Sequence, residues 1–321
     1  MSTLDERVER TVPGGAGVPG VTGGADRGAP GATPTAAALP PRRSGVARVR
    51  SWARKNPLSV VGAAIVLALV AMALLAPYLP LQNPVRMNVP KRFSPPGADF
   101  WFGTDHLGRD VFSRVVHGSA FSLAIGALTI LLSGVPGILV GIVGAAAPAR
   151  LAGLLMRALD VLMSFPSLLL AVAVGAALGT GGRSIVIALA VVYFPRVARM
   201  TRGIALSVMT QEYVTASRAL GTSVTRLLVR TVVPNCLSVV IVQCSLYFAE
   251  VLLAEAALSF LGLGEAPPRP TWGNMLYEAQ KNMRNAPWLA IFPGAAIAVS
   301  VFGLNLFGDA VRDAMDPRLR T

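Results

Sequence analysis

The chain has 321 residues, of which 53% are hydrophobic, and its mean hydropathy is +0.59. These values are too high for an ordinary soluble domain, so the composition excludes that class and favours a membrane protein. The formal charge of +13 would suggest nucleic-acid binding in a soluble protein. In a membrane protein, the position of the charges along the chain is more informative than their total.

The first segment, residues 1–56, is predicted to be a cytoplasmic tail. Up to about residue 41 it is rich in Gly, Pro, Ala and Thr, a composition that cannot build a buried core and is typical of disorder. Residues 42–55 are basic and contain Trp52, which favours a helix on anionic lipid over a nucleic-acid site. The tail has no apolar segment of the kind that a signal peptide needs.

Six apolar stretches follow, each close to the roughly 20 residues that a helix needs to cross a bilayer. We predict an all-α, multi-pass membrane protein, because a helix satisfies its own backbone hydrogen bonds and none of the stretches alternates as a barrel strand would. The transmembrane domain should cover residues 57–310, with a cytoplasmic tail at 311–321. Its predicted spans are residues 57–80, 119–147, 151–178, 184–206, 235–261 and 287–307.

The distribution of Lys and Arg predicts the orientation of these spans. If the N-terminus is cytoplasmic, 20 of the 29 basic residues lie on the inner side and 9 on the outer side. Cytoplasmic loops carry such an excess of basic residues. Both termini and the loop between the fourth and fifth spans are therefore predicted to be cytoplasmic.

Three carboxylates fall inside predicted spans and are candidates for a transport pathway or gate, because ionisable groups are costly in hydrocarbon. Asp160 follows Arg157 by three residues, so a local ion pair is the simpler interpretation. Glu250 and Glu255 are five residues apart and cannot line one face of a helix together. One could face a pathway and the other a neighbouring helix, and a proton relay stays open.

The sequence predicts neither a catalytic site nor a metal site. His106 and His117 are isolated, and Cys236 and Cys244 would be about 12 Å apart on one helix, beyond the reach of a disulfide. No G-x-x-x-x-G-K-[ST] phosphate-binding loop occurs, so the chain has no cofactor site of that kind. The energy for transport would come from a partner or from an ion gradient.

The loop between the fourth and fifth spans, Tyr213–Asn235, is predicted to form two short helices. Gly221 suits the left-handed position that closes the first helix, and Ser223 can cap the second. Pro234 fits the first turn of the next span. The residues alone leave two interpretations open, a connector lying on lipid and a surface that docks a partner.

This loop resembles the EAA loop of ABC-importer permeases, whose pattern is Glu-Ala-Ala, three residues, Gly, nine residues and Ile-x-Leu-Pro. The matching run has Thr215-Ala216-Ser217, then Gly221, then residues 231–234. Thr215 replaces the Glu, so the acidic side chain of the pattern is absent at that position. The resemblance implies coupling to an ATPase through Glu212, Tyr213, Thr215, Ala216, Ser217, Arg218, Gly221, Arg226 and Pro234.

Further runs narrow the resemblance to the C-type permease subunit of dipeptide, oligopeptide and nickel importers. They lie at residues 102–114, 160–171, 254–264, 267–276 and 308–320. The resemblance implies a non-catalytic subunit in the bacterial cytoplasmic membrane, paired with a homologous permease. It also implies two cytoplasmic ATPases that bind ATP and Mg, and an extracytoplasmic substrate-binding protein.

The outer loops are expected to receive that binding protein, with Asp105, Arg109, Asp110 and Trp272 as contact residues. Gating through the neighbouring permease is the alternative for the same loops. Peptides are the expected substrate, with nickel or another small solute as the alternative. An ion-coupled transporter using Glu250 or Asp160 is disfavoured, because the paired repeats of that class are missing. A membrane enzyme is disfavoured by the lack of a catalytic constellation.

Overall fold

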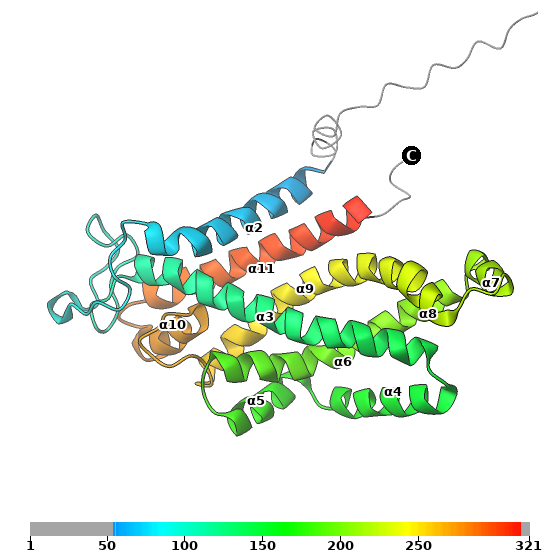
Figure 1. Ribbon diagram of the computed structural model, residues 1–321. Helices are drawn as coiled ribbons and strands as arrows, with labels where there is room; N and C mark the ends of the chain where they lie inside the picture. Colours follow the sequence, from blue (N-terminus) through cyan, green and yellow to red (C-terminus); the bar gives the residue numbers. More distant parts are fainter. Residues whose placement is uncertain (1–53, 55, 316–321) are drawn as a thin grey trace, which may run out of the picture. The chain divides into compact units, whose positions relative to one another are not determined.

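The computed structural model describes residue 54 and residues 56–315, so predictions for the N-terminal tail lie outside the described residues. The described chain is helical and has no β-strand; Thr104 and Asp110 form an isolated bridge. Its elements (Figure 1) are α2 (Pro57–Leu75), η1 (Ala76–Tyr78), η2 (Val89–Lys91), α3 (Val111–Ala146), α4 (Ala149–Met163), α5 (Ser167–Leu178), α6 (Gly182–Met209), α7 (Glu212–Ala219), α8 (Val224–Leu227), the π-helical segment η3 (Leu228–Val232), α9 (Val233–Phe260), α10 (Trp272–Ala279), η4 (Gln280–Asn282) and α11 (Trp288–Met315).

Five of these helical stretches are each long and apolar enough to cross a membrane, and α4 with α5 makes a sixth if the pair is one span. The predicted multi-pass helical fold is confirmed, but the prediction of one continuous helix over residues 151–178 is wrong. The α4–α5 pair is bent by 87°. Pro166 lacks a backbone N–H and disfavours helical geometry at Phe165, so the helix stops and restarts there.

The second span begins at Val111, eight residues earlier than predicted. Asp110 explains this early start, since its carboxylate accepts hydrogen bonds from the backbone N–H groups of Phe112 and Ser113. These bonds satisfy two of the donors that a helix start leaves free. The prediction from hydropathy began the span later, because Ser113, Arg114 and His117 are polar.

Small residues set the helix packing. α3 lies along α6, and α11 packs against both α2 and α9. A Cβ atom at Gly141 of α3 would lie 2.6 Å from the carbonyl oxygen of Ala198, and one at Gly62 of α2 would lie 2.5 Å from Leu306 Cβ. Close backbone approach at such positions is the usual basis of helix association in membranes.

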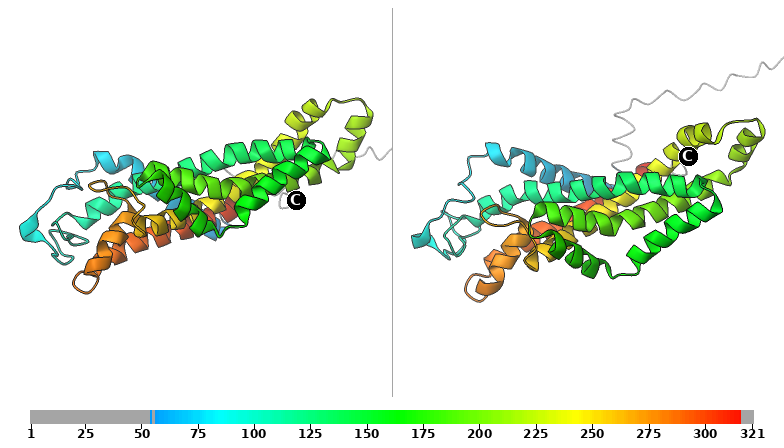
Figure 2. Two further views of the ribbon diagram at one scale, coloured as in Figure 1. Left: turned by 90° about the horizontal axis from the view of Figure 1, so that it is seen from below. Right: turned by 60° about the horizontal axis from the view of Figure 1, so that its bottom comes forward.

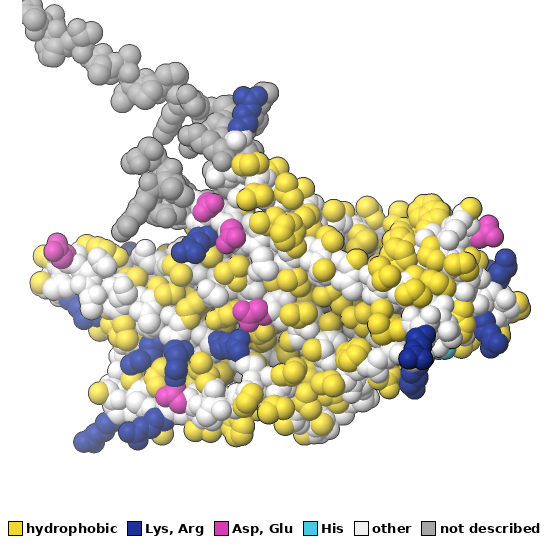
Figure 3. All heavy atoms as spheres, turned by 180° about the vertical axis from the view of Figure 1, so that it is seen from behind, with side chains coloured by type: hydrophobic (Ala, Val, Ile, Leu, Met, Phe, Trp, Pro, Cys, Tyr) yellow, Lys and Arg dark blue, Asp and Glu magenta, His cyan; other side chains and the backbone are white. Residues whose placement is uncertain are grey.

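The helices leave two distinct ends. Figures 1 and 2 show α7 and α8 at one end, and α10 with the loop before α3 at the opposite end. Between them, hydrophobic side chains cover much of the face seen in Figure 3, and Lys and Arg side chains are scarce in its middle. This pattern fits a helical domain that crosses a bilayer and presents a polar surface at each side.

Candidate functional site

The loop at the α7–α8 end has the turn geometry predicted from its sequence. Gly221 has a φ of +81°, and its N–H donates to the carbonyl of Arg218, while the N–H of Thr222 donates to the carbonyl of Ser217. This pair of bonds is the Schellman arrangement that closes a helix with a left-handed residue. Ser223 occupies the N-cap position of α8, but its side chain makes no capping bond.

Three buried apolar residues, Val214, Leu227 and Val232, anchor this loop to the rest of the chain. Several of its other large apolar side chains point outward, with Tyr213 and Val224 exposed and Leu220 87% exposed. The remaining predicted coupling residues are also accessible. Ser217 is half-buried, and the others are exposed: Glu212, Thr215, Ala216, Arg218, Gly221, Arg226 and Pro234. Pro234 lies in the first turn of α9, as predicted.

The opposite end contains a buried ionic network. Arg109 Nε lies 2.5 Å from Asp105 Oδ2, and a terminal nitrogen of Arg109 lies 2.8 Å from Glu278 Oε2. Arg114 shares the same Glu278 oxygen at 3.1 Å. Both arginines are 1% exposed. The network ties the loop before α3 to α10, across more than 160 residues of sequence.

This burial corrects the expectation for the outer loops. Asp105, Arg109, Asp110 and Trp272 are all buried, so their side chains cannot contact a binding protein. Trp272 donates from Nε1 to the carbonyl of Val115 at 2.9 Å. Burial raises the pKa of Asp110, opposed by its hydrogen bonds from the backbone N–H groups of Ser113 and Phe112. All four residues hold the α10 end together.

Asp105, His106 and Glu278 bring three ligand atoms to within 4.8 Å of one another. The carboxylates are already paired with Arg109 and Arg114, so a cation would have to displace a guanidinium from each. The geometry gives no support to a metal site there. The pairing of Glu278 with Arg114 could not be predicted from the sequence, because the two residues are 164 positions apart.

Charged residues also occur near the middle of the helices. Arg196 of α6 lies 3.2 Å from Glu250 of α9 and donates to Ser167 Oγ of α5 at 2.5 Å. Arg199, one turn further along α6, forms an ion pair with Asp160 of α4. Asp160 therefore pairs with Arg199, and the predicted local pair with Arg157 is wrong.

Glu250 and Glu255 have different surroundings, as their separation on the helix predicted. The Glu250 side chain is 52% exposed, whereas Glu255 is 1% exposed and accepts a hydrogen bond from Ser259 Oγ at 2.9 Å. A Cβ atom at Gly273 would lie 2.6 Å from Ser259 Cβ, so the neighbouring segment packs tightly here. Glu255 belongs to the helix packing and does not line an open surface.

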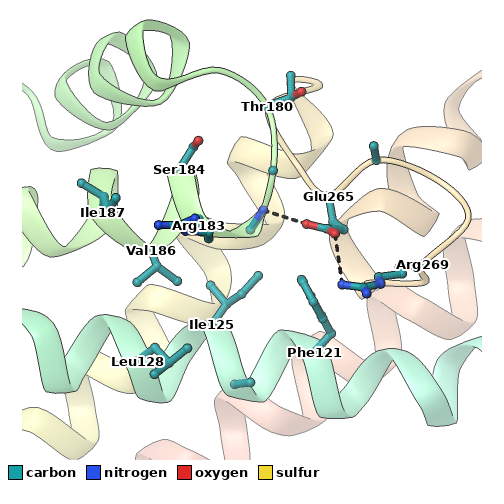
Figure 4. Close-up of a pocket in the computed structure, with 14 residues that line it drawn as sticks. Phe121, Ile125, Leu128, Thr180, Arg183, Ser184, Val186, Ile187, Glu265 and Arg269 are labelled. Atoms are coloured by element: carbon teal, nitrogen blue, oxygen red, sulfur yellow. Dashed lines mark hydrogen bonds and ion pairs between the residues drawn. The ribbon is translucent and has the colours of Figure 1, made fainter.

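A hollow of about 620 Å³ lies beside the start of α6 (Figure 4). Glu265 closes one side of it and accepts a hydrogen bond from the backbone N–H of Gly182 at 2.8 Å, which places a negative charge at the helix N-terminus. Arg269 lies 3.7 Å from the same carboxylate. Phe121, Ile125 and Leu128 of α3 form its apolar floor. Arg183 also lines the hollow, so its lining carries two positive side chains and one negative side chain.

Two family profiles match the chain. The profile of the binding-protein-dependent transport system inner membrane component matches residues 137–321. The profile of the N-terminal transmembrane domain of oligopeptide transport permease C matches residues 50–96. The solved inward-facing structure of the MetNI methionine ABC transporter covers 63% of this chain and 96% of its own, with a TM-score of 0.54 and 19% identity. That structure shares the fold.

Named relatives agree with these profiles. A Brucella suis protein whose name assigns it to a peptide transport system is 43% identical over 81% of this chain and 88% of its own. The di/tripeptide transport system permease protein of Pseudomonas aeruginosa is 42% identical over 83% and 89%. The glutathione transport system permease protein of Pectobacterium atrosepticum is 37% identical over 84% and 91%. The chain belongs to the binding-protein-dependent transport system inner membrane components, as a C-type permease of the kind found in peptide transporters.

Proposed function

We propose that this chain is a non-catalytic permease subunit of an ATP-driven importer in the bacterial cytoplasmic membrane. With a homologous permease it forms the translocation pathway for di- or oligopeptides. An extracytoplasmic binding protein delivers the peptide, and two cytoplasmic ATPases bind ATP and Mg. The names of the relatives support the peptide substrate, and the family membership supports this division of labour.

The exposed α7–α8 loop is the observation that carries the proposal. Leu220 sits at the turn and is 87% exposed, with exposed Arg218 and Arg226 on either side of the turn. Small exposed residues such as Ala216 and Ala219 allow close approach of a partner. This combination suits a groove on an ATPase.

The charge distribution supports a cytoplasmic position for this loop. Arg196 and Arg199 lie near the middle of α6, so they do not belong to a loop. They are therefore subtracted from the number of Lys and Arg residues on the inner side. The inner side still carries twice as many Lys and Arg residues as the outer side. The α7–α8 end therefore faces the cytoplasm and the α10 end faces outward, where exposed residues such as Trp101 and Met283 are available to a binding protein.

An uptake experiment tests this function. A host lacking its own peptide and nickel importers would receive the complete transporter with all partner subunits. We expect uptake of labelled dipeptide that requires ATP hydrolysis by the partners. A matched strain with this chain deleted is the control. Restored nickel accumulation without dipeptide uptake would favour the alternative substrate, and uptake that followed an ion gradient without ATP would overturn the importer class.

A further inference from the structure

Four charged side chains form a continuous strip at mid-depth of the helices. Arg196 is about 20 Å from either end of α6, at 1.5 Å per residue, and Glu250 is about 15 Å from the outer end of α9. Arg196 and Arg199 share one face of α6, because they are three residues apart. The ion pairs Glu250–Arg196 and Arg199–Asp160 therefore follow one another along α6.

This strip is open in the described chain. The side chains of Asp160, Arg199 and Glu250 are each about half exposed, and that of Arg196 is 31% exposed. A charged side chain at this depth does not face lipid, and such groups point toward a bundle interior or a water-filled cavity. Glu255 on the same helix avoids lipid in a different way, because it is buried in the protein and hydrogen-bonded.

The break between α4 and α5 lies at the same place. Non-helical backbone at membrane depth occurs only where it is buried in protein or lines a water-filled cavity. Ser167, the first residue of α5, receives the Arg196 hydrogen bond, and a small cavity of about 80 Å³ lies between this break and α6. Phe165 within the break is itself exposed. The break is therefore not covered by this chain.

We propose that Asp160, Arg196, Arg199 and Glu250, together with the α4–α5 break, line the water-filled translocation pathway and bind the charged termini of a zwitterionic peptide. The guanidinium groups take the peptide carboxylate, which their planar fork matches, and the two carboxylates take its ammonium group. Arg196 also lies 5.1 Å from the centre of the Tyr193 ring, which orients its guanidinium. The assignment of peptide as ligand rests on the proposed function.

The ion pairs Glu250–Arg196 and Arg199–Asp160 are weak enough for a ligand to bind them and move on. An exposed ion pair contributes little to stability, because water screens it. A peptide terminus can therefore replace one partner and be replaced again by it. A deeply buried pair, such as Arg109 with Asp105, could not exchange in this way.

Cysteine labelling of the complete transporter tests the proposal. Cys236 and Cys244 would first be replaced by Ser, and Glu250→Cys would be compared with Leu67→Cys near the middle of α2. Leu67 is 69% exposed, more than Glu250, so exposure in this chain alone predicts that it reacts faster. A charged, water-soluble methanethiosulfonate reagent reacts only with thiols in water. Labelling would be measured in membrane vesicles with ADP and with ATP plus vanadate.

We expect Glu250→Cys to react at least tenfold faster than Leu67→Cys in one of the two states. Ser167→Cys keeps all four charges of the strip, so it should react as fast as Glu250→Cys, and dipeptide should slow its reaction. Equal, slow labelling of Glu250→Cys and Leu67→Cys, or labelling of Ser167→Cys that dipeptide leaves unchanged, overturns the inference. A wild-type transporter that imports dipeptide while Glu250→Cys stays unreactive leaves the proposed function standing, so the two can fail separately.

Charge removal gives a second readout. Glu250→Gln and Arg196→Gln should each lower the rate of dipeptide uptake at least tenfold while the transporter still assembles. Arg150→Gln removes an equally positive, exposed side chain at the start of α4, away from the strip, and should leave uptake within twofold of wild type. Normal uptake by both strip variants would overturn the role in binding.

Discussion

The two ends of the molecule differ in how far their side chains are buried. At the α10 end, Arg109 and Arg114 are buried against Asp105 and Glu278, and every member of this network has its partner within the same chain. At the α7–α8 end, Leu220 and Tyr213 are exposed and find no such cover in the described chain. The α10 end thus buries a charged network of its own, whereas the α7–α8 end leaves large apolar side chains uncovered at its turn.

This contrast separates stability from function. Substitutions at the buried outer end should change the free energy of unfolding, because they leave charges or cavities inside the protein. Substitutions at the exposed inner end should leave that free energy nearly unchanged and act on assembly with the ATPase.

Glu278→Ala should cause the largest loss. It removes the shared partner of Arg109 and Arg114, both 1% exposed, and leaves buried positive charge uncompensated. Breaking such a pair costs about 3–5 kcal/mol. The thermal unfolding midpoint in detergent measures the effect. Asp99→Ala removes an exposed carboxylate from the same end and should leave the midpoint unchanged; equal midpoints for both variants would contradict the buried network.

Trp272→Ala should destabilise the protein by a similar or slightly smaller amount. The indole is fully buried and donates to the carbonyl of Val115, so its removal leaves a cavity and an unpaired acceptor. Removing a buried aromatic side chain costs about 3–5 kcal/mol. Trp101→Ala is the matched control, because Trp101 is exposed at the same end. If the Trp101 variant loses as much stability, packing around Trp272 is not the cause.

Gly221→Val should have a smaller effect on stability and a large effect on uptake. A left-handed conformation costs a residue with a Cβ about 1–2 kcal/mol, although a Cβ there would meet no other atom within 4 Å. We expect a folded, membrane-inserted protein that no longer co-purifies with the ATPase. Gly153→Val, at an equally open helical position, should retain the ATPase. A fully active Gly221→Val transporter would rule out docking at this loop.

The last test should not affect stability at all. In a background with Cys236 and Cys244 replaced, Ser223→Cys and Met283→Cys place one exposed thiol at each end. An impermeant reagent added to intact cells should label Met283→Cys and miss Ser223→Cys. Thr271 lies near the outer end but is buried, so it would be a poor reporter. The reverse pattern would invert the orientation and remove the cytoplasmic docking site.

The sequence predicted the features that depend on local composition. Apolar runs located the spans, and the glycine at 221 predicted the turn that ends α7. The break at Pro166 was not predictable in this way, because Pro136, Pro195 and Pro293 lie inside helices that continue. A proline in an apolar run is thus compatible with either outcome, and packing decides.

Ion pairs between residues far apart in the sequence could not be predicted either. Glu278 is separated from Arg109 by 169 residues, and Glu250 is separated from Arg196 by 54. Nothing in the local sequence distinguishes the buried partner from the exposed one. Asp105 and Trp272 were therefore predicted as exposed contact residues, whereas the structure buries both.

The π-helical segment η3 has a mechanical consequence. It joins α8 to α9 without interruption, so Val224–Phe260 is one helical rod of 37 residues, about 55 Å long at 1.5 Å per residue. If this rod pivots about its outer end, each degree of tilt moves its inner end by about 1 Å. A displacement of a few ångströms imposed on α8 then swings Glu250 by a smaller, geometrically fixed amount, and η3, with its wider turn, is the point where the rod would bend first.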